Sequence, residues 1–225
     1  MTGSEQSASR PLFTRDELLR LIIPLVIEEE KMQKACEVAG KEPIFRILPY
    51  QKKKAGIVTT GSEVYYHRIE DKFTPVVIEK LKECGVTEVK QIQCNDDHEM
   101  ITEAIQTLIE DGSDLIVCTG GMSVDPDDRT PLAIKNACTE VVTYGAPVLP
   151  GAMFMLAYCE KEGRQIPVMG LPGCVMYAKR TIFDLVLPRI MCDEKLHEKD
   201  FRLLGQGGLC LSCPVCTFPN CGFGK

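Results

Sequence analysis

From residue 55 onward, short apolar runs alternate with amphipathic stretches, and this alternation limits the fold more than any other feature of the chain. Apolar runs that are typical of strands occupy 55–60, 88–94, 114–118, 141–143, 153–159 and 167–170. Apolar residues at helical spacing lie between and after them, at 73–84, 101–109, 130–138 and 175–186, and Pro188 is expected to end the last helix. Strands that alternate with helices predict an α/β fold with a mostly parallel sheet covered on both faces.

The chain is predicted to have three parts. Residues 1–45 form an N-terminal extension, in which a helix is expected over 28–39 and a short strand begins near its end, at 43–49. Residues 46–193 hold the α/β domain, and residues 194–225 form a cysteine-rich tail.

Composition excludes several classes of protein. With 225 residues, the chain can form one large domain with its own core. Its formal net charge of −6 argues against nucleic-acid binding, which needs a basic face. No apolar stretch approaches the roughly 20 residues of a membrane helix, and the N-terminal sequence does not look like a secretory signal, so a cytoplasmic location is expected. Eight of the twelve cysteines are scattered and are interpreted as mostly buried thiols in a reducing compartment.

Three of the predicted strands end in polar or glycine-rich loops, at 59–63, 94–97 and 119–128. In parallel sheets, ligands bind beyond the carboxyl ends of the strands. The pair Gly120-Gly121 allows a tight turn whose N–H groups can face an anion, and Ser123 adds a hydroxyl donor. The glycine pair alone is equally compatible with a plain strand-to-helix turn.

Acidic residues accompany these loops. Asp125, Asp127 and Asp128 follow the glycine pair, and carboxylates beside a phosphate suit Mg²⁺, which bridges the two. Solvated turn residues are the alternative for Asp125 and Asp127. One of Asp96 and Asp97 is expected to cap the following helix, and the other to face the site.

Together these segments resemble the molybdenum-cofactor biosynthesis domain of molybdopterin molybdotransferases, molybdopterin adenylyltransferases and gephyrin-type proteins. The resemblance covers about 50–192, and its order and spacing match the molybdotransferase branch better. It rests on Thr60-Gly61-Ser62-Glu63, Asp96-Asp97, Thr119-Gly120-Gly121-Met122-Ser123-Val124 with Asp128, Pro150-Gly151 and Leu171-Pro172-Gly173. The fold that it implies is a three-layer α/β/α sandwich.

The resemblance implies molybdopterin as ligand or substrate and Mg²⁺-dependent chemistry, with Asp96 and Asp128 as the catalytic acids. Glu63 would bind the amino-pyrimidine edge of the pterin. The residues implied in pterin binding are Thr60, Gly61, Ser62, Glu63, Gly120, Gly121, Ser123, Pro172 and Gly173. A homo-oligomer is expected because relatives assemble as dimers or trimers, and a molybdoenzyme is the expected partner.

The chain departs from the family pattern at several positions. Leu149 and Ala152 stand where the family usually has two lysines that resemble a molybdate site. Ser62 replaces an acid, and Cys174-Val175 replace the Asn-Pro of the closing loop. Because neither Leu149 nor Ala152 can hold a dianion, the sequence favours pterin binding over molybdate transfer.

The tail carries four cysteines with the spacing C-x2-C-x2-C-x4-C, at Cys210, Cys213, Cys216 and Cys221. Four thiolates can hold a zinc ion or an iron–sulfur cluster. The x2-x2 opening resembles ferredoxin-type ligation more than a zinc ribbon, although the x4 gap fits neither pattern fully. An unliganded tail is the alternative.

Three functions therefore stay open. The first is a transferase that inserts molybdenum into molybdopterin. The second is a non-catalytic molybdopterin carrier or sensor with a metal-binding tail. The third is a nucleotide enzyme of a competence-damage type, which shares this domain.

Overall fold

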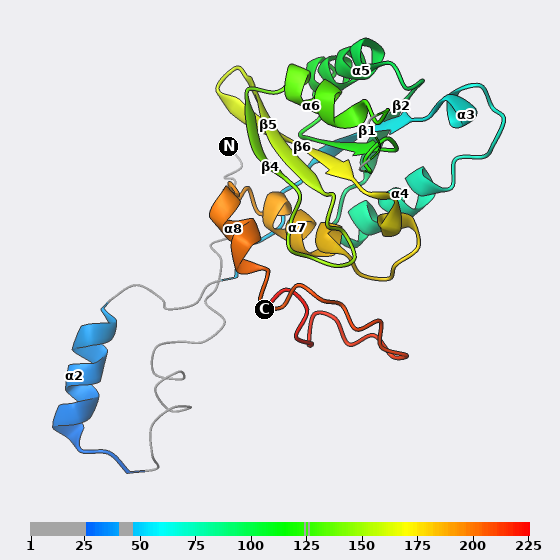
Figure 1. The fold of residues 1–225 in the computed structure, drawn as a ribbon. Coiled ribbons are helices and arrows are strands. Elements are labelled where there is room, and N and C mark those ends of the chain that lie inside the picture. Colours follow the sequence, from blue (N-terminus) through cyan, green and yellow to red (C-terminus); the bar gives the residue numbers. More distant parts are fainter. Residues whose placement is uncertain (1–25, 41–46, 124, 126) are drawn as a thin grey trace. The chain divides into compact units, whose positions relative to one another are not determined.

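The computed structural model describes residues 26–40, 47–123, 125 and 127–225, which divide into one unit up to Pro49 and another from Tyr50 (Figure 1). In the first unit, helix α2 (Glu29–Ala39) is followed by Gly40 with φ +72, which confirms the predicted helix and its end. Most of the strand predicted at 43–49 lies outside the described residues.

The second unit is built on a six-stranded sheet of order β2-β1-β3-β6-β5-β4. Its strands are β1 (Lys54–Thr60), β2 (Glu88–Cys94), β3 (Leu115–Thr119), β4 (Glu140–Tyr144), β5 (Met155–Lys161) and β6 (Arg164–Leu171). Strand β1 runs parallel to β2 and β3, and β3 runs parallel to β6. Strand β5 is antiparallel to both of its neighbours. The prediction of a mostly parallel sheet is confirmed.

Helices cover both faces of this sheet (Figure 1). One face carries α5 (His98–Glu110) and α6 (Thr130–Ala137), and the other carries α4 (Phe73–Glu83) and α7 (Ile182–Met191). Successive β3 residues point to opposite faces, so Leu115 and Val117 join one core cluster while Ile116 and Cys118 join the other. The three-layer α/β/α sandwich is confirmed. Short elements complete the unit: α3 (Ser62–Tyr65), the 3₁₀ turn η1 (Gly173–Met176) and α8 (Glu198–Leu203).

The helix predicted at 175–186 is wrong in its bounds. The chain forms η1 first, and α7 begins only after Thr181. The Thr181 hydroxyl accepts from the Phe183 N–H, while Asp184 accepts from the Thr181 N–H, which is a capping box. Pro188 lies inside α7 rather than at its end. The apolar run obscured this cap in the sequence.

A buried ion pair fixes α7 to α4. The Lys80 ammonium lies 2.7 Å from one Asp184 carboxylate oxygen and 2.9 Å from the other, and it also donates to the Lys179 carbonyl oxygen. Arg180 adds a bond of 2.9 Å to Asp184. These contacts hold the segment that connects η1 to α7.

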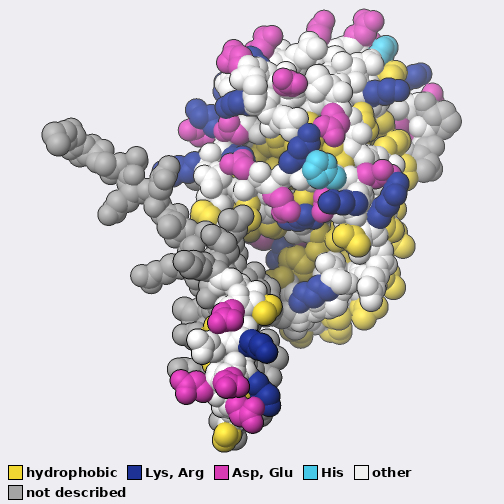
Figure 2. Space-filling model, turned by 90° about the vertical axis from the view of Figure 1, so that its left-hand side faces the viewer, with side chains coloured by type: hydrophobic (Ala, Val, Ile, Leu, Met, Phe, Trp, Pro, Cys, Tyr) yellow, Lys and Arg dark blue, Asp and Glu magenta, His cyan; other side chains and the backbone are white. Residues whose placement is uncertain are grey.

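Two further observations concern the length of the helices and the charge of the surface. None of the described helices is long and apolar enough to cross a membrane. On the face shown in Figure 2, Lys and Arg side chains are interspersed with Asp and Glu.

Candidate functional site

The parallel strands end level with one another. Thr60 pairs with Cys94, Thr59 pairs with Thr119, and Thr119 pairs with Leu171. The loops that follow β1, β2, β3 and β6 therefore gather along one edge of the sheet, as the sequence predicts.

The turn after β3 requires both of its glycines. Gly120 has φ +86 and Gly121 has φ +53, a region that disfavours other residues. A Cβ at Gly120 would overlap the carbonyl oxygen of Thr60, and one at Gly121 would lie 2.8 Å from the Thr130 hydroxyl oxygen. The Thr60 hydroxyl in turn donates to the Thr119 carbonyl oxygen at 3.1 Å. Close contact between β1, β3 and the start of α6 thus sets the backbone of this turn.

Two buried side chains adjoin the Gly120-Gly121 turn after β3, which is called the Gly120 turn below. Met122 is 3% exposed, and it fits against Gly170, where a Cβ would lie 2.7 Å from the Met122 sulfur. Met122 is therefore a core anchor for the turn. Thr119 is 1% exposed, and its hydroxyl is the buried side-chain polar group without a hydrogen-bond partner among the described residues. Unpaired buried hydroxyls are uncommon in folded proteins, and this one lies at the start of the turn.

Asp128 fastens the rest of this loop. Its carboxylate accepts from the Ser123 N–H at 2.6 Å, while the Ser123 hydroxyl accepts from the Asp125 N–H at 3.3 Å. The Tyr144 hydroxyl donates to the Ser123 carbonyl oxygen at 3.2 Å, and burial together with the negative charge of Asp128 raises the pKa of Tyr144. The Ser123 N–H is therefore already bound to Asp128, and an anionic ligand would compete with that carboxylate for it.

The two acids after β2 have separate contacts. The Asp96 carboxylate accepts from both the N–H and the hydroxyl of Ser62, each at 2.8 Å, so it links the loops after β1 and β2. Asp97 caps α5 by accepting from the N–H groups of Glu99 and Met100, and these bonds lower the pKa of Asp97. The expected cap is therefore Asp97.

Glu63 lies in the first turn of α3, where its side chain is exposed. Gly61 before it has φ +131, and a Cβ there would meet no atom within 4 Å. The Glu63 carbonyl oxygen accepts from the N–H groups of Arg68 and Ile69, which closes the loop behind it. The carboxylate is accordingly open to solvent at the sheet edge.

A cavity of about 500 Å³ lies between the Gly120 turn and the loop after β6. Three of the residues predicted to bind the pterin line it: Ser123, Pro172 and Gly173. The other predicted residues at the sheet edge, which are Thr60, Gly61, Ser62, Glu63, Asp96, Gly120, Gly121 and Asp128, are not among its lining residues.

The lining also contains three of the positions that depart from the family pattern. Leu149 and Ala152 both contribute to it, and Cys174 stands beside Gly173. Of the described residues around this cavity, none is Lys or Arg. A dianion would therefore meet no positive side chain here.

The C-terminal tail forms one wall of the same cavity, which the sequence did not predict. Leu209 and Cys210 line it. The Leu149 N–H donates to the Gly208 carbonyl oxygen at 2.7 Å, and the Cys210 N–H donates to the Leu149 carbonyl oxygen at 2.8 Å. A Cβ at Gly208 would overlap the Pro147 carbonyl oxygen, so this glycine admits the close approach. In the sequence, the Gly207-Gly208 pair was the one feature that could have indicated this close approach of the tail.

The predicted metal sites stay predictions. Within residues 26–40 and 47–225, apart from positions 124 and 126, no three His, Cys, Asp or Glu side chains are gathered closely enough to bind a metal ion. This holds for the four tail cysteines and for the acids at the sheet edge.

Comparison with known proteins gives matches to one family and one fold. The model of the molybdenum-cofactor biosynthesis family, described as a probable molybdopterin binding domain, matches residues 56–191. A CinA-like protein of Mycobacterium sp. (strain MCS) is 35% identical over 85 residues, which are 38% of this chain and 20% of that protein. A CinA-like protein of Mycobacterium avium (strain 104) is 34% identical over 95 residues, 42% of this chain and 22% of that protein. The chain thus matches about a fifth of the length of these relatives.

Two solved structures share the fold. A putative molybdenum cofactor biosynthesis protein from Corynebacterium diphtheriae superposes with a TM-score of 0.51 at 14% identity, over 64% of this chain and 97% of that one. A molybdopterin biosynthesis protein from Mycobacterium abscessus gives 0.50 at 18% identity, over 63% and 92%. Because the family model covers more than half of the sequence, the chain belongs to the molybdenum-cofactor biosynthesis family and carries its molybdopterin-binding domain.

Proposed function

We propose that the chain binds molybdopterin at the sheet edge, with the ligand phosphate at the Gly120 turn and the remainder in the 500 Å³ cavity. The observation that carries this proposal is the convergence of Ser123 with Pro172 and Gly173 on one cavity, from loops that are far apart in sequence. Glycine-rich turns at strand ends favour phosphate because they present N–H groups to the anion.

The side chains around the turn support a phosphate in two ways. The buried hydroxyl of Thr119 lacks a partner within the described chain and lies one residue before Gly120. The Ser123 hydroxyl accepts from Asp125, so its own hydrogen stays available to donate to a ligand oxygen.

Under this proposal, Asp128 would be the carboxylate that holds Mg²⁺. A magnesium ion needs only one or two carboxylates when a phosphate supplies further oxygens. The Asp128 carboxylate binds the Ser123 N–H, so a phosphate at that N–H and the carboxylate would lie side by side and repel each other. Mg²⁺ would neutralise this repulsion. Asp96, which holds Ser62, is the second acid that the family pattern assigns to such chemistry.

Molybdenum insertion is the reaction that Asp96 and Asp128 would serve in this family. In this chain, Leu149 and Ala152 give the cavity no positive side chain for molybdate. Pterin binding and delivery without molybdate activation is therefore the second candidate function, and this lining is the observation that favours it.

One experiment separates the candidates. Purified protein is titrated with molybdopterin, and the loaded protein is then incubated with Mg²⁺, molybdate and a molybdenum-free molybdoenzyme. Recovery of the molybdoenzyme activity supports insertion, whereas tight pterin binding without recovery supports a carrier. Binding of a nucleotide in place of molybdopterin would refute both and favour the competence-damage type. Light scattering in the same experiment tests the predicted homo-oligomer.

A further inference from the structure

The end of the chain folds into a closed loop. The Gly224 N–H donates to the Gly207 carbonyl oxygen at 2.8 Å, and a Cβ at Gly207 would overlap the carbonyl oxygens of Gly222 and Lys225. The segment between these ends contains no helix and no strand. Long loops without secondary structure are uncommon in compact domains and are usually either functional or linker segments.

Little apolar packing holds this loop. Leu211 and Val215 are each 77% exposed, while Phe223 is 5% exposed. The loop surrounds a cavity of about 530 Å³ in place of a packed core. A cross-link would stabilise a long loop of this kind by restricting the unfolded chain.

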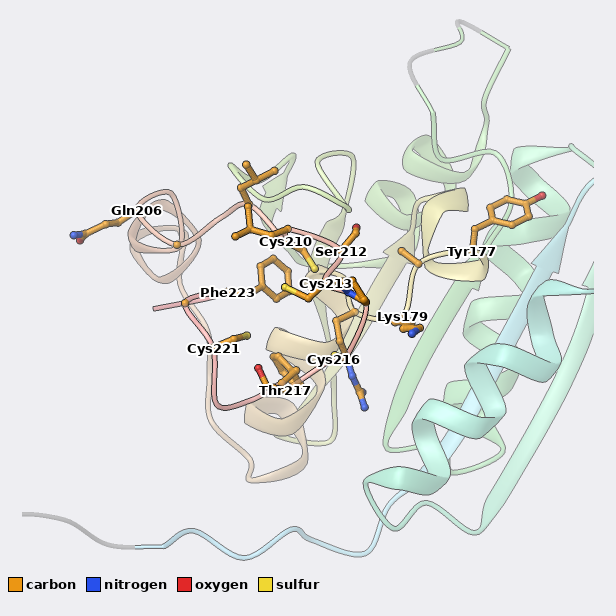
Figure 3. A pocket seen from close by; sticks show the side chains of 18 residues that line it. Tyr177, Lys179, Gln206, Cys210, Ser212, Cys213, Cys216, Thr217, Cys221 and Phe223 are labelled. Atoms are coloured by element: carbon orange, nitrogen blue, oxygen red, sulfur yellow. The ribbon is translucent and has the colours of Figure 1, made fainter.

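All four tail cysteines line that one cavity, which are Cys210, Cys213, Cys216 and Cys221. In Figure 3, the side chains of Cys210, Cys213 and Cys221 lie around the ring of Phe223, between the two arms of the loop. Four thiols from one short segment therefore line the same cavity, although they are not gathered at ligand distance.

The charge around this cavity suits an anionic centre. Lys179 and Arg180 line it, and none of its described lining residues is Asp or Glu. The Arg180 guanidinium lies 5.1 Å from the centre of the Phe218 ring, and it is held there by Glu83 and Asp184. Four thiolates on one divalent ion carry a net charge of −2, toward which Lys179 offers a positive charge, while Arg180 is already paired with Glu83 and Asp184.

We propose that Cys210, Cys213, Cys216 and Cys221 together bind one thiophilic metal centre, either a zinc ion or an iron–sulfur cluster. Binding would replace the four thiol protons, which are released to solvent, with bonds from the metal to sulfur. The loop must contract for this, because the four thiols are not gathered at ligand distance in the described chain.

The same centre would control one wall of the pterin cavity, and this part of the proposal rests on the proposed function. Cys210 lines both cavities, and its N–H is bound to the Leu149 carbonyl oxygen. Fixing the Cys210 sulfur on a metal would therefore fix Leu209 and the wall of the pterin cavity. The metal-bound form should bind molybdopterin more tightly.

The metal site is tested with the full chain, purified without oxygen and analysed for zinc, iron and sulfide. One zinc ion per chain without colour, or iron and sulfide with broad visible absorption, supports the proposal, and the spectrum tells the two apart. The double variant Cys213→Ser/Cys216→Ser should lose the metal, whereas Cys36→Ser, from the N-terminal unit, should keep it. A chain that stays metal-free after incubation with zinc, and with iron and sulfide, would overturn the proposal. So would full metal retention by the double variant.

The coupling is tested by comparing molybdopterin affinity in the metal-loaded chain and in Cys213→Ser/Cys216→Ser. These two cysteines do not line the pterin cavity, so their loss removes no ligand contact there. We expect affinity to fall by about fivefold or more, as is usual for coupled sites. Equal affinity in both forms would refute the coupling. A metal-loaded chain that binds no molybdopterin would refute the proposed function and leave the metal site established.

Discussion

Replacing Gly120 with alanine tests whether the turn after β3 is shaped for a ligand. Gly112, which follows α5, offers a matched control because it has the same φ of +86, but a Cβ added there would meet no atom within 4 Å. At Gly120 the same methyl group would overlap the carbonyl oxygen of Thr60 and lie 2.7 Å from its hydroxyl oxygen. The two variants thus share the backbone cost and differ only in the steric contact.

The expected magnitudes follow from this difference. A non-glycine residue with left-handed backbone costs about 1–2 kcal/mol, and this applies to both variants. Overpacking against a fixed backbone adds about 1–3 kcal/mol, and this applies to Gly120→Ala alone. The overlap can be relieved only if the turn moves away from β1, which displaces the N–H groups that we assign to the ligand phosphate.

Urea unfolding of both variants measures the first effect, with equal m-values as the check that the unfolded states are comparable. Titration with molybdopterin in the absence of urea measures the second. Gly120→Ala should be the less stable variant by about 1–3 kcal/mol and should bind the pterin at least about tenfold more weakly, a loss typical of charge-assisted contacts. Equal stability of the two variants would refute the steric argument, and unchanged pterin affinity in a folded Gly120→Ala would refute the placement of the phosphate.

Three further predictions concern stability and reactivity. Lys80→Met should lower the free energy of unfolding by about 1.5–3 kcal/mol in urea because it removes a charge-assisted hydrogen bond from the buried Asp184 carboxylate, which keeps Arg180 and the Thr181 N–H as partners, whereas Lys90→Met, at an exposed ion pair, should cost at most about 1 kcal/mol. The Arg189 hydrogen bond lowers the pKa of Glu194, so the stabilisation by this pair is complete above the usual Glu value and is lost as pH falls from that value through the lowered pKa of the folded state. Thermal unfolding between pH 6 and about pH 3 should show this loss of stability, and the loss should be smaller in Glu194→Gln. An equal loss in the variant would contradict its assignment to Glu194. Burial raises the pKa of Cys94 to about 11, so a thiol reagent followed by mass spectrometry at pH 7.5 should label it only in urea, and labelling of the native chain would disprove its burial.

The fold could be predicted from the sequence because its signals are local. Each buried strand is a short apolar run, and each helix has apolar residues three or four positions apart. The order of the elements and the level strand ends follow directly from these patterns. The cap at Asp97 is equally local. The start of α7 was missed because the apolar residues around Thr181 continue the helical pattern across a break that only the capping box reveals.

The site was harder to predict because its decisive contacts join distant segments. Asp128 could be assigned to the loop, but its bond to the Ser123 N–H depends on the exact path of the intervening residues. The docking of Leu209 beside Leu149 joins residues that no periodicity relates. The loops at the strand ends were therefore predictable, but the part of the tail in the cavity and the groups already paired within the loops were not.

Leu149 stands where the family usually has a lysine, and it is also the residue that the tail contacts. These two features are independent of each other. The tail is held at Leu149 by main-chain hydrogen bonds, which any residue at that position could make. The side chains of Leu149 and Leu209 remain 57% and 60% exposed, so neither is needed as a packing contact. Tail docking therefore does not explain why position 149 is uncharged. The absence of a positive side chain from the lining agrees with our proposal that the cavity holds a pterin without an oxyanion beside it, and the tail adds a second wall to that same cavity.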